Sequence, residues 1–321
     1  MKPGRAAQQT PILSTLLRRA AVRATTAASV RNSQPWQLEL HSDHLVVRAD
    51  RGRWLSVFDP TKRQLLLSCG AAVLNARVAL AAADVAVDVC RGRDAERTKR
   101  PGDLAVLRVR AEAADADCAL SDLDGEIERR RSSWGPFTGP AAAGVVAALV
   151  ATARAEGADL VPIAPDAAAR SARLAARVLD EDPAYLAELR AWRTVDPRRR
   201  DGLPCGARAV GPDATGKTWL PDDLDWQSSS CLVLSTSADA SPDWLRAGEA
   251  LQRILLVATA LQISVHVMSL PIEVPSSREL IAVAAGREGH PQLVLRVGSA
   301  QPAPPSARRR LVEVIRTVGI P

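Results

Sequence analysis

The chain has 321 residues, of which 47% are apolar, and its formal net charge is +6. This length and apolar content predict one large folded domain or two smaller ones, and they exclude a disordered chain. Only four of the 42 basic residues are lysines, so the positive charge reflects a general use of arginine and does not by itself indicate a nucleic-acid partner.

The N-terminal part of the sequence predicts two helices and two pairs of short strands. In the second helix, Leu66, Cys69 and Val73 recur near helical spacing, so one face of that helix is expected to be buried. The expected elements are, in order, a helix over residues 11–28, strands over 37–40 and 44–49 joined in a hairpin, a helix from Thr61, strands over 85–90 and 104–109, and an aspartate-rich connector over 113–124.

The remaining sequence predicts longer helices around a second group of strands. Leu251, Ile254 and Ala258 share one helical face, which places their helix in the core. Because hairpins are mixed with helices instead of forming repeated βαβ units, the pattern favours the α+β class. The expected elements are helices over 140–157, 166–180, 183–193 and 244–261, strands over 160–163, 231–234, 264–268 and 292–297, a helix between the last two strands, and a basic tail.

Residues 195–229 differ from their surroundings, because they combine several Pro and Gly residues with few apolar runs. A loop of this length within a compact chain is typical of a lid, a binding loop or a disordered insert.

Within that loop, residues 211–218 match the P-loop pattern G-x-x-x-x-G-K-[ST]. A phosphate-binding P-loop needs a buried strand before it and a helix after it. The residues before it form a poor strand, and Pro221 stops a following helix. The match is therefore expected to be the tip of the lid.

The most informative segment is Arg31-Asn32-Ser33-Gln34-Pro35-Trp36, which lies between an Ala-rich helix and a strand. Its amides, hydroxyl, proline and indole favour a turn that presents backbone N–H and C=O groups beside a flat apolar surface. Such a surface suits a heteroaromatic ring with polar edges. Flavin is the first ligand that it indicates.

Two arginine clusters have the chemistry to bind phosphate. Arg130 and Ser132, near a predicted helix end, combine guanidinium N–H groups with a hydroxyl. Adjacent arginines are also typical of a solvated helix face, and the same two interpretations apply to residues 308–310 in the tail.

The cysteines and histidines indicate neither a disulfide framework nor a metal site. The five cysteines are odd in number and form no Cys-x-x-Cys pair, and the four histidines are not near acidic or thiol residues at ligand spacing. We therefore expect reduced thiols and no metal. Since no Ser/His/Asp set or carboxylate pair stands out, a cofactor is expected to carry any chemistry.

The N-terminus and the hydropathy of the chain predict its location. No stretch approaches the roughly 18 to 20 apolar residues that cross a bilayer. The first 38 residues lack acidic side chains, as transit peptides do, but their apolar residues suit the first helix of a folded domain. We expect a cytoplasmic protein that binds neither membrane nor nucleic acid.

Taken in order, these segments resemble the nitroreductase-like flavoproteins. The resemblance is closest to the actinobacterial Acg-type branch, in which two nitroreductase lobes are fused in one chain. Residues 28–36 are similar to the family's Pro-Ser-x-His-Asn-Ser/Thr-Gln-Pro-Trp segment. The other similar segments follow in the family's order: 68–72, 130–132, 201–204, 246–251, 271–273 and 308–309.

The resemblance implies an α+β nitroreductase fold in which lobes 1–120 and 121–321 form an intramolecular pseudo-dimer, with the lid at about 195–229. It also implies one FMN per chain, NAD(P)H as the reductant, and no catalytic side chain, because flavin N5 carries the chemistry. The implied cofactor-binding residues are Ser29, Arg31, Asn32 and Gln34 around the ring, Arg130, Ser132, Arg308 and Arg309 at the phosphate, and Pro271, Ile272 and Glu273 near N5.

Three residues depart from the family pattern. Ala28 replaces the usual proline and Arg31 the usual histidine, which changes the wall near the ring. Trp134 stands where the family places a second phosphate-binding cation. Losing one charge-assisted contact would cost about 1.5–3 kcal/mol, which is roughly one to two decades of affinity.

The implied function is the ping-pong reduction of nitro compounds, quinones or similar small-molecule electrophiles by NAD(P)H, in a monomeric pseudo-dimer or a homodimer. An alternative is a protein that sequesters FMN under a closed lid with little or no turnover. A third hypothesis, a P-loop nucleotide hydrolase, predicts Mg-ATP binding that is lost in Lys217→Ala.

Overall fold

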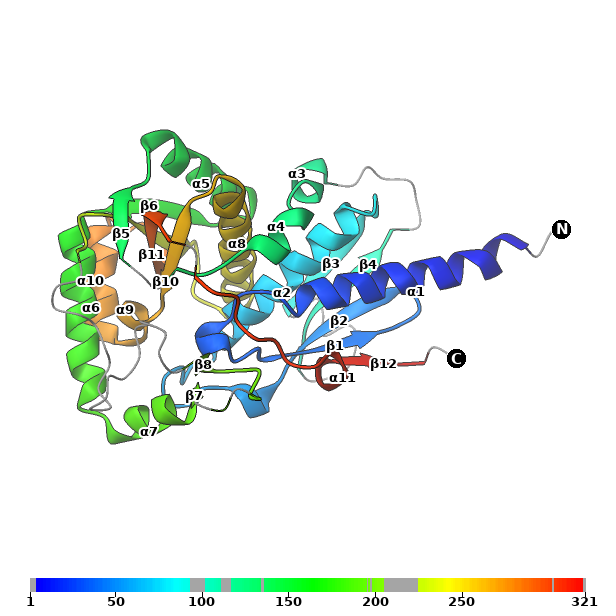
Figure 1. Ribbon diagram of the computed structural model, residues 1–321, viewed down its shortest axis with the longest axis horizontal. Coiled ribbons are helices and arrows are strands. Elements are labelled where there is room, and N and C mark those ends of the chain that lie inside the picture. The colour runs from blue at the N-terminus through cyan, green and yellow to red at the C-terminus, as the bar shows by residue number, and fades with distance from the viewer. Residues whose placement is uncertain are drawn as a thin grey trace.

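The computed structural model describes residues 4–92, 102–110, 117–133, 136–194, 196, 198–204, 225–301 and 303–319. Two five-stranded sheets, each covered by helices, stand on either side of a central pair of long helices (Figure 1). This arrangement confirms the α+β class. The layers are mixed because each sheet is built mainly from antiparallel neighbours and is then covered by helices that come from elsewhere in the chain.

The first sheet has the strand order β12-β1-β2-β4-β3. The predicted hairpin is confirmed, with Leu38 opposite Val47, and β1 alternates buried and half-buried residues so that one face meets the core. Helix α1 packs against this face beside the first of the two central helices. The bounds are α1 Gly4–Ala24, β1 Trp36–Leu40, β2 His44–Ala49, β3 Val87–Arg91, β4 Asp103–Val109 and β12 Ile315–Thr317.

Strand β12 comes from the far end of the chain, which crosses from the second sheet to the first (Figure 1). It pairs in parallel with β1, placing Ile315 opposite Leu38, and the N–H of Val318 donates to the Leu40 carbonyl at 2.8 Å. The sequence predicted only a basic tail here. A three-residue strand is too short to show alternation, and its partner lies at the other end of the sequence.

The second sheet has the order β10-β11-β9-β6, and β5 also pairs with β11. Its strands are hydrophobic on both faces because α5 and α8 cover one side and α6, α9 and α10 cover the other. The bounds are β5 Phe137–Pro140, α5 Ala143–Ala155, β6 Asp159–Ile163, α6 Pro165–Asp180, α7 Pro183–Ala191, β9 Ser230–Thr236, α8 Ser241–Ala260, β10 Ser264–Met268, α9 Leu270–Glu273, α10 Pro275–Ala284 and β11 His290–Ala300.

The central pair is α8 and α2 (Arg63–Ala81), and two glycines allow the helices to touch backbone to backbone. A Cβ on Gly70 would lie 2.0 Å from the Leu245 carbonyl oxygen, and a Cβ on Gly248 would lie 2.0 Å from the Leu67 carbonyl oxygen. The contact is reciprocal, since each helix contributes one glycine and one carbonyl.

Helix α2 is apolar around its whole circumference because protein surrounds it. One face packs against the first sheet, another against α8, and Leu74 and Val78 meet the short helices α3 (Cys118–Ser121) and α4 (Asp124–Arg129). By length and hydropathy α2 could span a membrane, contrary to the expectation that no stretch would. Since 94% of that stretch is buried inside the protein, it is the core helix of the fold.

The described part of the expected connector, residues 117–124, is not a simple link. It contains α3, whose first turn is capped by Asp117, since that carboxylate accepts the N–H of Leu120 at 3.2 Å. The sequence missed this helix because it is four residues long, which is too short to show a helical period. The remaining short elements are η1 Val30–Asn32, η2 Arg51–Arg53, β7 Arg193–Thr194, β8 Leu203–Pro204 and α11 Leu311–Val314.

Candidate functional site

The chain between α1 and β1, residues 29–34, adopts a backbone that few residues favour. Left-handed φ angles cost non-glycine residues roughly 1–3 kcal/mol each. Two serines hold the turn: Ser29 Oγ accepts the N–H of Gln34, and Ser68 Oγ on α2 accepts the N–H of Val30, both at 3.1 Å. The left-handed residues and their φ angles are Arg31 (46°), Asn32 (52°) and Gln34 (50°).

Gln34 joins this 29–34 loop to two distant segments. Its Nε2 donates to the Arg200 carbonyl at 2.8 Å, and its Oε1 accepts the backbone N–H of Arg309 at 2.8 Å. The side chain is fully buried. Gln34 therefore ties the start of the predicted lid and the C-terminal segment to the loop.

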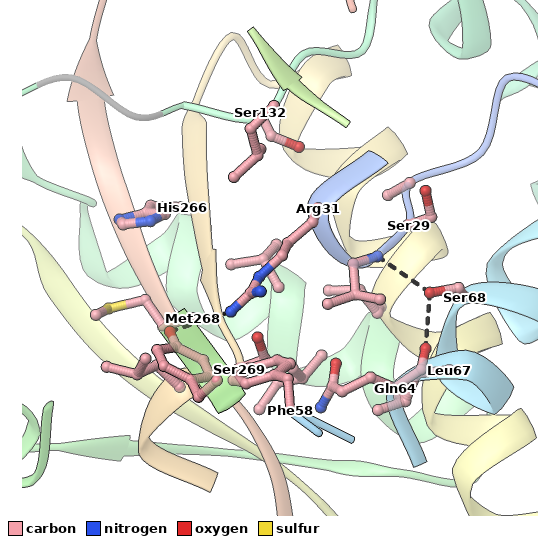
Figure 2. A pocket seen from close by; sticks show the side chains of 18 residues that line it. Ser29, Arg31, Phe58, Gln64, Leu67, Ser68, Ser132, His266, Met268 and Ser269 are labelled. Atoms are coloured by element: carbon pink, nitrogen blue, oxygen red, sulfur yellow. Dashed lines mark hydrogen bonds between the residues drawn. The ribbon is translucent and has the colours of Figure 1, made fainter. Parts of the chain in front are cut away.

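Beside the loop lies a cavity between the two halves of the chain (Figure 2). It contains about 940 Å³ of space free of protein atoms, part of it open to solvent. Leu67, Leu251 and Leu293 form an apolar wall. The polar side chains on it are Ser29, Arg31, Gln64, Ser68, Ser132, Tyr185, His266 and Ser269.

Arg31 extends across this cavity towards Met268, with Ser132 on one side and Phe58 on the other (Figure 2). Its guanidinium lies 4.4 Å from the centre of the Phe58 ring, and its Nη2 donates to the Tyr185 hydroxyl at 3.1 Å. Burial lowers the pKa of Arg31. An arginine in this setting is nevertheless cationic at neutral pH.

At the Ser132 side, the cavity borders a buried group of arginines. Arg130 is 6% exposed, and its Nη1 donates to Ser132 Oγ at 3.2 Å. Burial, and then repulsion from Arg308 and Arg131, lower the pKa of Arg130 to about 9. Among the described residues, no carboxylate lies within ion-pair distance of Arg130 or Arg308, and the Nε of each is buried and unpaired. This is an arrangement that an anion would stabilise.

Arg308 and Arg309 point to opposite sides of the extended C-terminal segment. Arg308 donates from Nη1 to Asn32 Oδ1 at 3.0 Å and from Nη2 to the carbonyls of Thr26 and Ala27, both at 3.1 Å. The guanidinium of Arg309 instead pairs with Asp50 at 3.2 Å. The structure thus places Arg308 beside Arg130 and turns Arg309 into the first lobe.

Pro271, Ile272 and Glu273 form the short helix α9 and lie off the cavity wall. The Glu273 carboxylate turns inward, where it pairs with Arg63 at 3.0 Å and accepts from Gln64 Nε2 at 2.7 Å. Met268, Ser269 and Leu270, the first residue of α9, line the cavity instead.

The chain resembles known proteins over nearly its whole length, although no protein-family model matches it. It is 31% identical over 313 residues to "Putative NAD(P)H nitroreductase Rv3131" of Mycobacterium tuberculosis strain H37Rv, covering 91% of this chain and 88% of that protein. The chain belongs to the nitroreductase family. "Putative NAD(P)H nitroreductase acg" of the same strain is 29% identical over 332 residues, covering 95% of this chain and 96% of that protein.

Solved structures with similar folds are more distant from this family member. The "putative nitroreductase" from Anabaena variabilis is 10% identical, with a TM-score of 0.46 over 80% of this chain and 69% of that one. A Bacteroides fragilis nitroreductase with bound FMN is 13% identical, with a TM-score of 0.42 over 62% of this chain and 99% of that one.

Three residues that the family resemblance assigned to the cofactor lie on the cavity wall: Ser29, Arg31 and Ser132. Arg130 and Arg308 border it at the arginine group. The other predicted residues do not line the cavity, and their role at the cofactor stays a prediction. Asn32 and Gln34 hold the loop to the C-terminal segment and the lid, Arg309 pairs with Asp50, and Pro271, Ile272 and Glu273 pack beneath the site.

The sequence did not reveal Phe58 and Tyr185, which flank Arg31 on the cavity wall with ring centres 5.9 Å apart. One signal was available in the composition. Tyr185 is the single tyrosine of the chain, and Phe58 is one of its two phenylalanines. In a chain so poor in aromatic residues, each of them is a candidate for a specific contact.

Some predictions fall on residues outside the described ranges. These are Trp134 and most of the predicted lid, residues 205–224, which include the P-loop-like segment 211–218. Within the described residues, no group of three or more His, Cys, Asp or Glu side chains could hold a metal ion. Cys69 is buried, and burial raises the pKa of its thiol well above the usual range.

Beneath the site, two buried carboxyl groups share one arginine. Asp59 is 1% exposed, and its Oδ2 accepts the N–H of Leu65, near the start of α2, at 2.9 Å. Burial, and then the charge of Glu273, raise the pKa of Asp59 to about 7. Arg63 pairs with Glu273.

The Asp59→Asn variant is expected to gain stability over the wild type as the pH rises. The Asp59 carboxyl titrates near its ordinary pKa of 3.8 in the unfolded chain and near 7 in the folded one, so the folded state retains a proton between these values. Wild-type stability should therefore fall from about pH 4 to about pH 7, by up to ~1.4 kcal/mol per pH unit, and then level off. Urea unfolding of both proteins across this range measures the difference. If the difference in free energy of unfolding between the two proteins stays constant across this pH range, the raised pKa of Asp59 beside Glu273 and Arg63 is contradicted.

Proposed function

We infer that this nitroreductase-family chain is an FMN-dependent NAD(P)H oxidoreductase that holds one flavin in the cavity between its halves. The observation that supports this most strongly is the buried Arg130, which has no carboxylate partner among the described residues and borders the cavity between the halves. The donor set fits a phosphate. Guanidinium N–H groups and the Ser132 hydroxyl converge there, and Arg308 adds a second cation.

The reciprocal contact of Gly70 and Gly248 supports a pseudo-dimer of lobes 1–120 and 121–321. The two glycines are as far apart in the sequence as their partners, Leu67 and Leu245. This equal spacing is expected when two equivalent helices cross at a pseudo-two-fold axis. The cavity lies between the lobes, because Ser68 on α2 and Leu251 on α8 both line it.

FMN, when bound, would supply hydride transfer between NAD(P)H and an electrophile such as a nitro compound or a quinone. The chain's own residues would bind and orient the flavin. Arg130 and Ser132 would hold the phosphate, while Leu67, Leu251 and Leu293 form an apolar surface that excludes water from the ring. Burial, and then the charge of Arg296, lower the pKa of His266 to about 3, so that this side chain lines the cavity as a neutral imidazole.

A second candidate function, sequestration of FMN under a closed lid, is favoured by the start of the 195–229 loop. The N–H of Gly202 donates to the Asn32 carbonyl at 3.3 Å, and Leu203 lies on the cavity wall. A lid fixed at this point would restrict access to the flavin face.

An absorption spectrum of the purified protein with added FMN, followed by anaerobic NADPH and then NADH, tests both functions. Retained flavin that bleaches within seconds is the expected result and establishes a reductase. Retained flavin that stays oxidised with both nucleotides would favour sequestration. Failure to retain FMN would overturn the cofactor assignment.

A further inference from the structure

Arg31 presents an N–H group that nothing in the described structure uses. Its Nη2 donates a hydrogen bond to the Tyr185 hydroxyl, but its Nη1 is buried and has no hydrogen-bond partner. The guanidinium is fixed in place, because it stacks on the Phe58 ring and projects from a left-handed backbone at φ 46°. A buried, unpaired guanidinium N–H on a cavity wall points to a hydrogen-bond acceptor on the ligand.

No carboxylate neutralises this cation within the described residues. Glu188 and Glu273 are the acidic groups that interact with it electrostatically, but neither forms an ion pair with it. Glu188 accepts the backbone N–H groups of Val57 and Phe58, each at 3.0 Å, and Glu273 is paired with Arg63. The described cavity wall contains no aspartate or glutamate.

The cavity therefore has two separate cationic points. One is the Arg130 group beside Ser132, which is assigned above to the FMN phosphate, and the other is Arg31 on the far side, among Phe58, Tyr185 and Met268. A flavin phosphate held at the first point leaves the second for another ligand. The aromatic rings around Arg31 suit a planar ligand whose anionic group meets the guanidinium.

We propose that Arg31 binds an anionic group of the electron acceptor, so that the chain selects planar aromatic electrophiles carrying a carboxylate over their neutral analogues. This rests on the proposed function, which supplies the flavin and the reduction. A charge-assisted hydrogen bond formed with the acid but not with a neutral isostere is expected to give a ten- to hundred-fold preference.

The test compares 4-nitrobenzoate with its neutral analogue 4-nitrobenzamide on the FMN-saturated protein. Dissociation constants are measured by calorimetry without NAD(P)H, and kcat/KM is measured with NADPH. The variants are Arg31→Met, which removes the charge, Arg31→Lys, which keeps the charge but loses the planar fork, and the control Arg51→Met on an exposed turn away from the cavity.

We expect the wild type and Arg51→Met to bind the acid ten- to hundred-fold more tightly than the amide. In Arg31→Met this ratio should fall to about one with amide binding unchanged, and Arg31→Lys should show an intermediate ratio. A wild-type ratio near one overturns the inference, even if Arg31→Met does not fold. The inference is also overturned if Arg31→Met loses affinity for FMN or NADPH but still binds the acid more tightly than the amide.

The two proposals fail in different ways. Acid preference in the dissociation constants without bleaching of the flavin would support the role of Arg31 and contradict the reductase. Flavin that bleaches, with acid and amide reduced equally well, would support the reductase and contradict the role of Arg31.

Discussion

Replacing Gly248 by alanine is expected to lower the free energy of unfolding by about 3 kcal/mol or more. The added Cβ would lie 2.0 Å from the carbonyl oxygen of Leu67 and 2.7 Å from its carbonyl carbon. Both atoms belong to the backbone of α2, so no side chain can rotate away. The helices must separate, and separation opens the core between the two sheets.

Urea unfolding followed by circular dichroism measures this loss, with Gly144→Ala as the control. Gly144 lies in the first turn of α5, where an added Cβ meets nothing within 4 Å, so its variant should be unchanged or slightly stabilised. The double variant Gly70→Ala/Gly248→Ala should lose less than the sum of the single losses, because one separation of the helices relieves both contacts. Strict additivity would contradict the reciprocal crossing.

The Arg130→Met variant is expected to weaken FMN binding about ten- to hundred-fold without lowering the free energy of unfolding of the apoprotein. A charge-assisted contact to phosphate is worth about 1.5–3 kcal/mol. In the free protein, by contrast, the Arg130 cation is buried and repelled by Arg308 and Arg131, which is why its pKa is lowered to about 9. Removing it should leave the free energy of unfolding equal or higher.

Riboflavin, which lacks the phosphate, is the matched ligand for this prediction. The wild type should bind FMN more tightly than riboflavin, and Arg130→Met should reduce that difference while changing riboflavin affinity little. Arg310→Met serves as the control variant, since Arg310 is an exposed neighbour of Arg308 and Arg309. If Arg130→Met loses affinity for FMN and riboflavin equally, Arg130 has a structural role and does not bind the phosphate.

The sequence predicted features that depend on neighbouring residues. The hairpin of β1 and β2 follows from alternation over a few residues. Arg130 and Ser132 were singled out together from their spacing, and the structure places them in hydrogen-bond contact. The 29–34 loop was also located, because amides and a proline between a helix and a strand require a turn.

Other parts of the site depend on contacts that no local pattern encodes. Arg31 meets Tyr185 only through the fold. Arg308 and Arg309 have identical side chains, but consecutive residues of an extended segment face opposite ways, and the sequence does not say which faces the cavity. The approach of the backbone around Glu273 to flavin N5 stays a prediction, but the ion pair of its carboxylate with Arg63 could not be read from the sequence.

The parallel pairing of β12 with β1 affects the order of events during synthesis. A chain made from its N-terminus exposes the outer edge of β1 until residues 315–317 have left the ribosome, and contacts between such distant segments form late. The backbone N–H of Arg309, which clamps Gln34, arrives with the same segment. The nascent protein thus carries an open sheet edge and an unclamped 29–34 loop until residues 309–317 have been made.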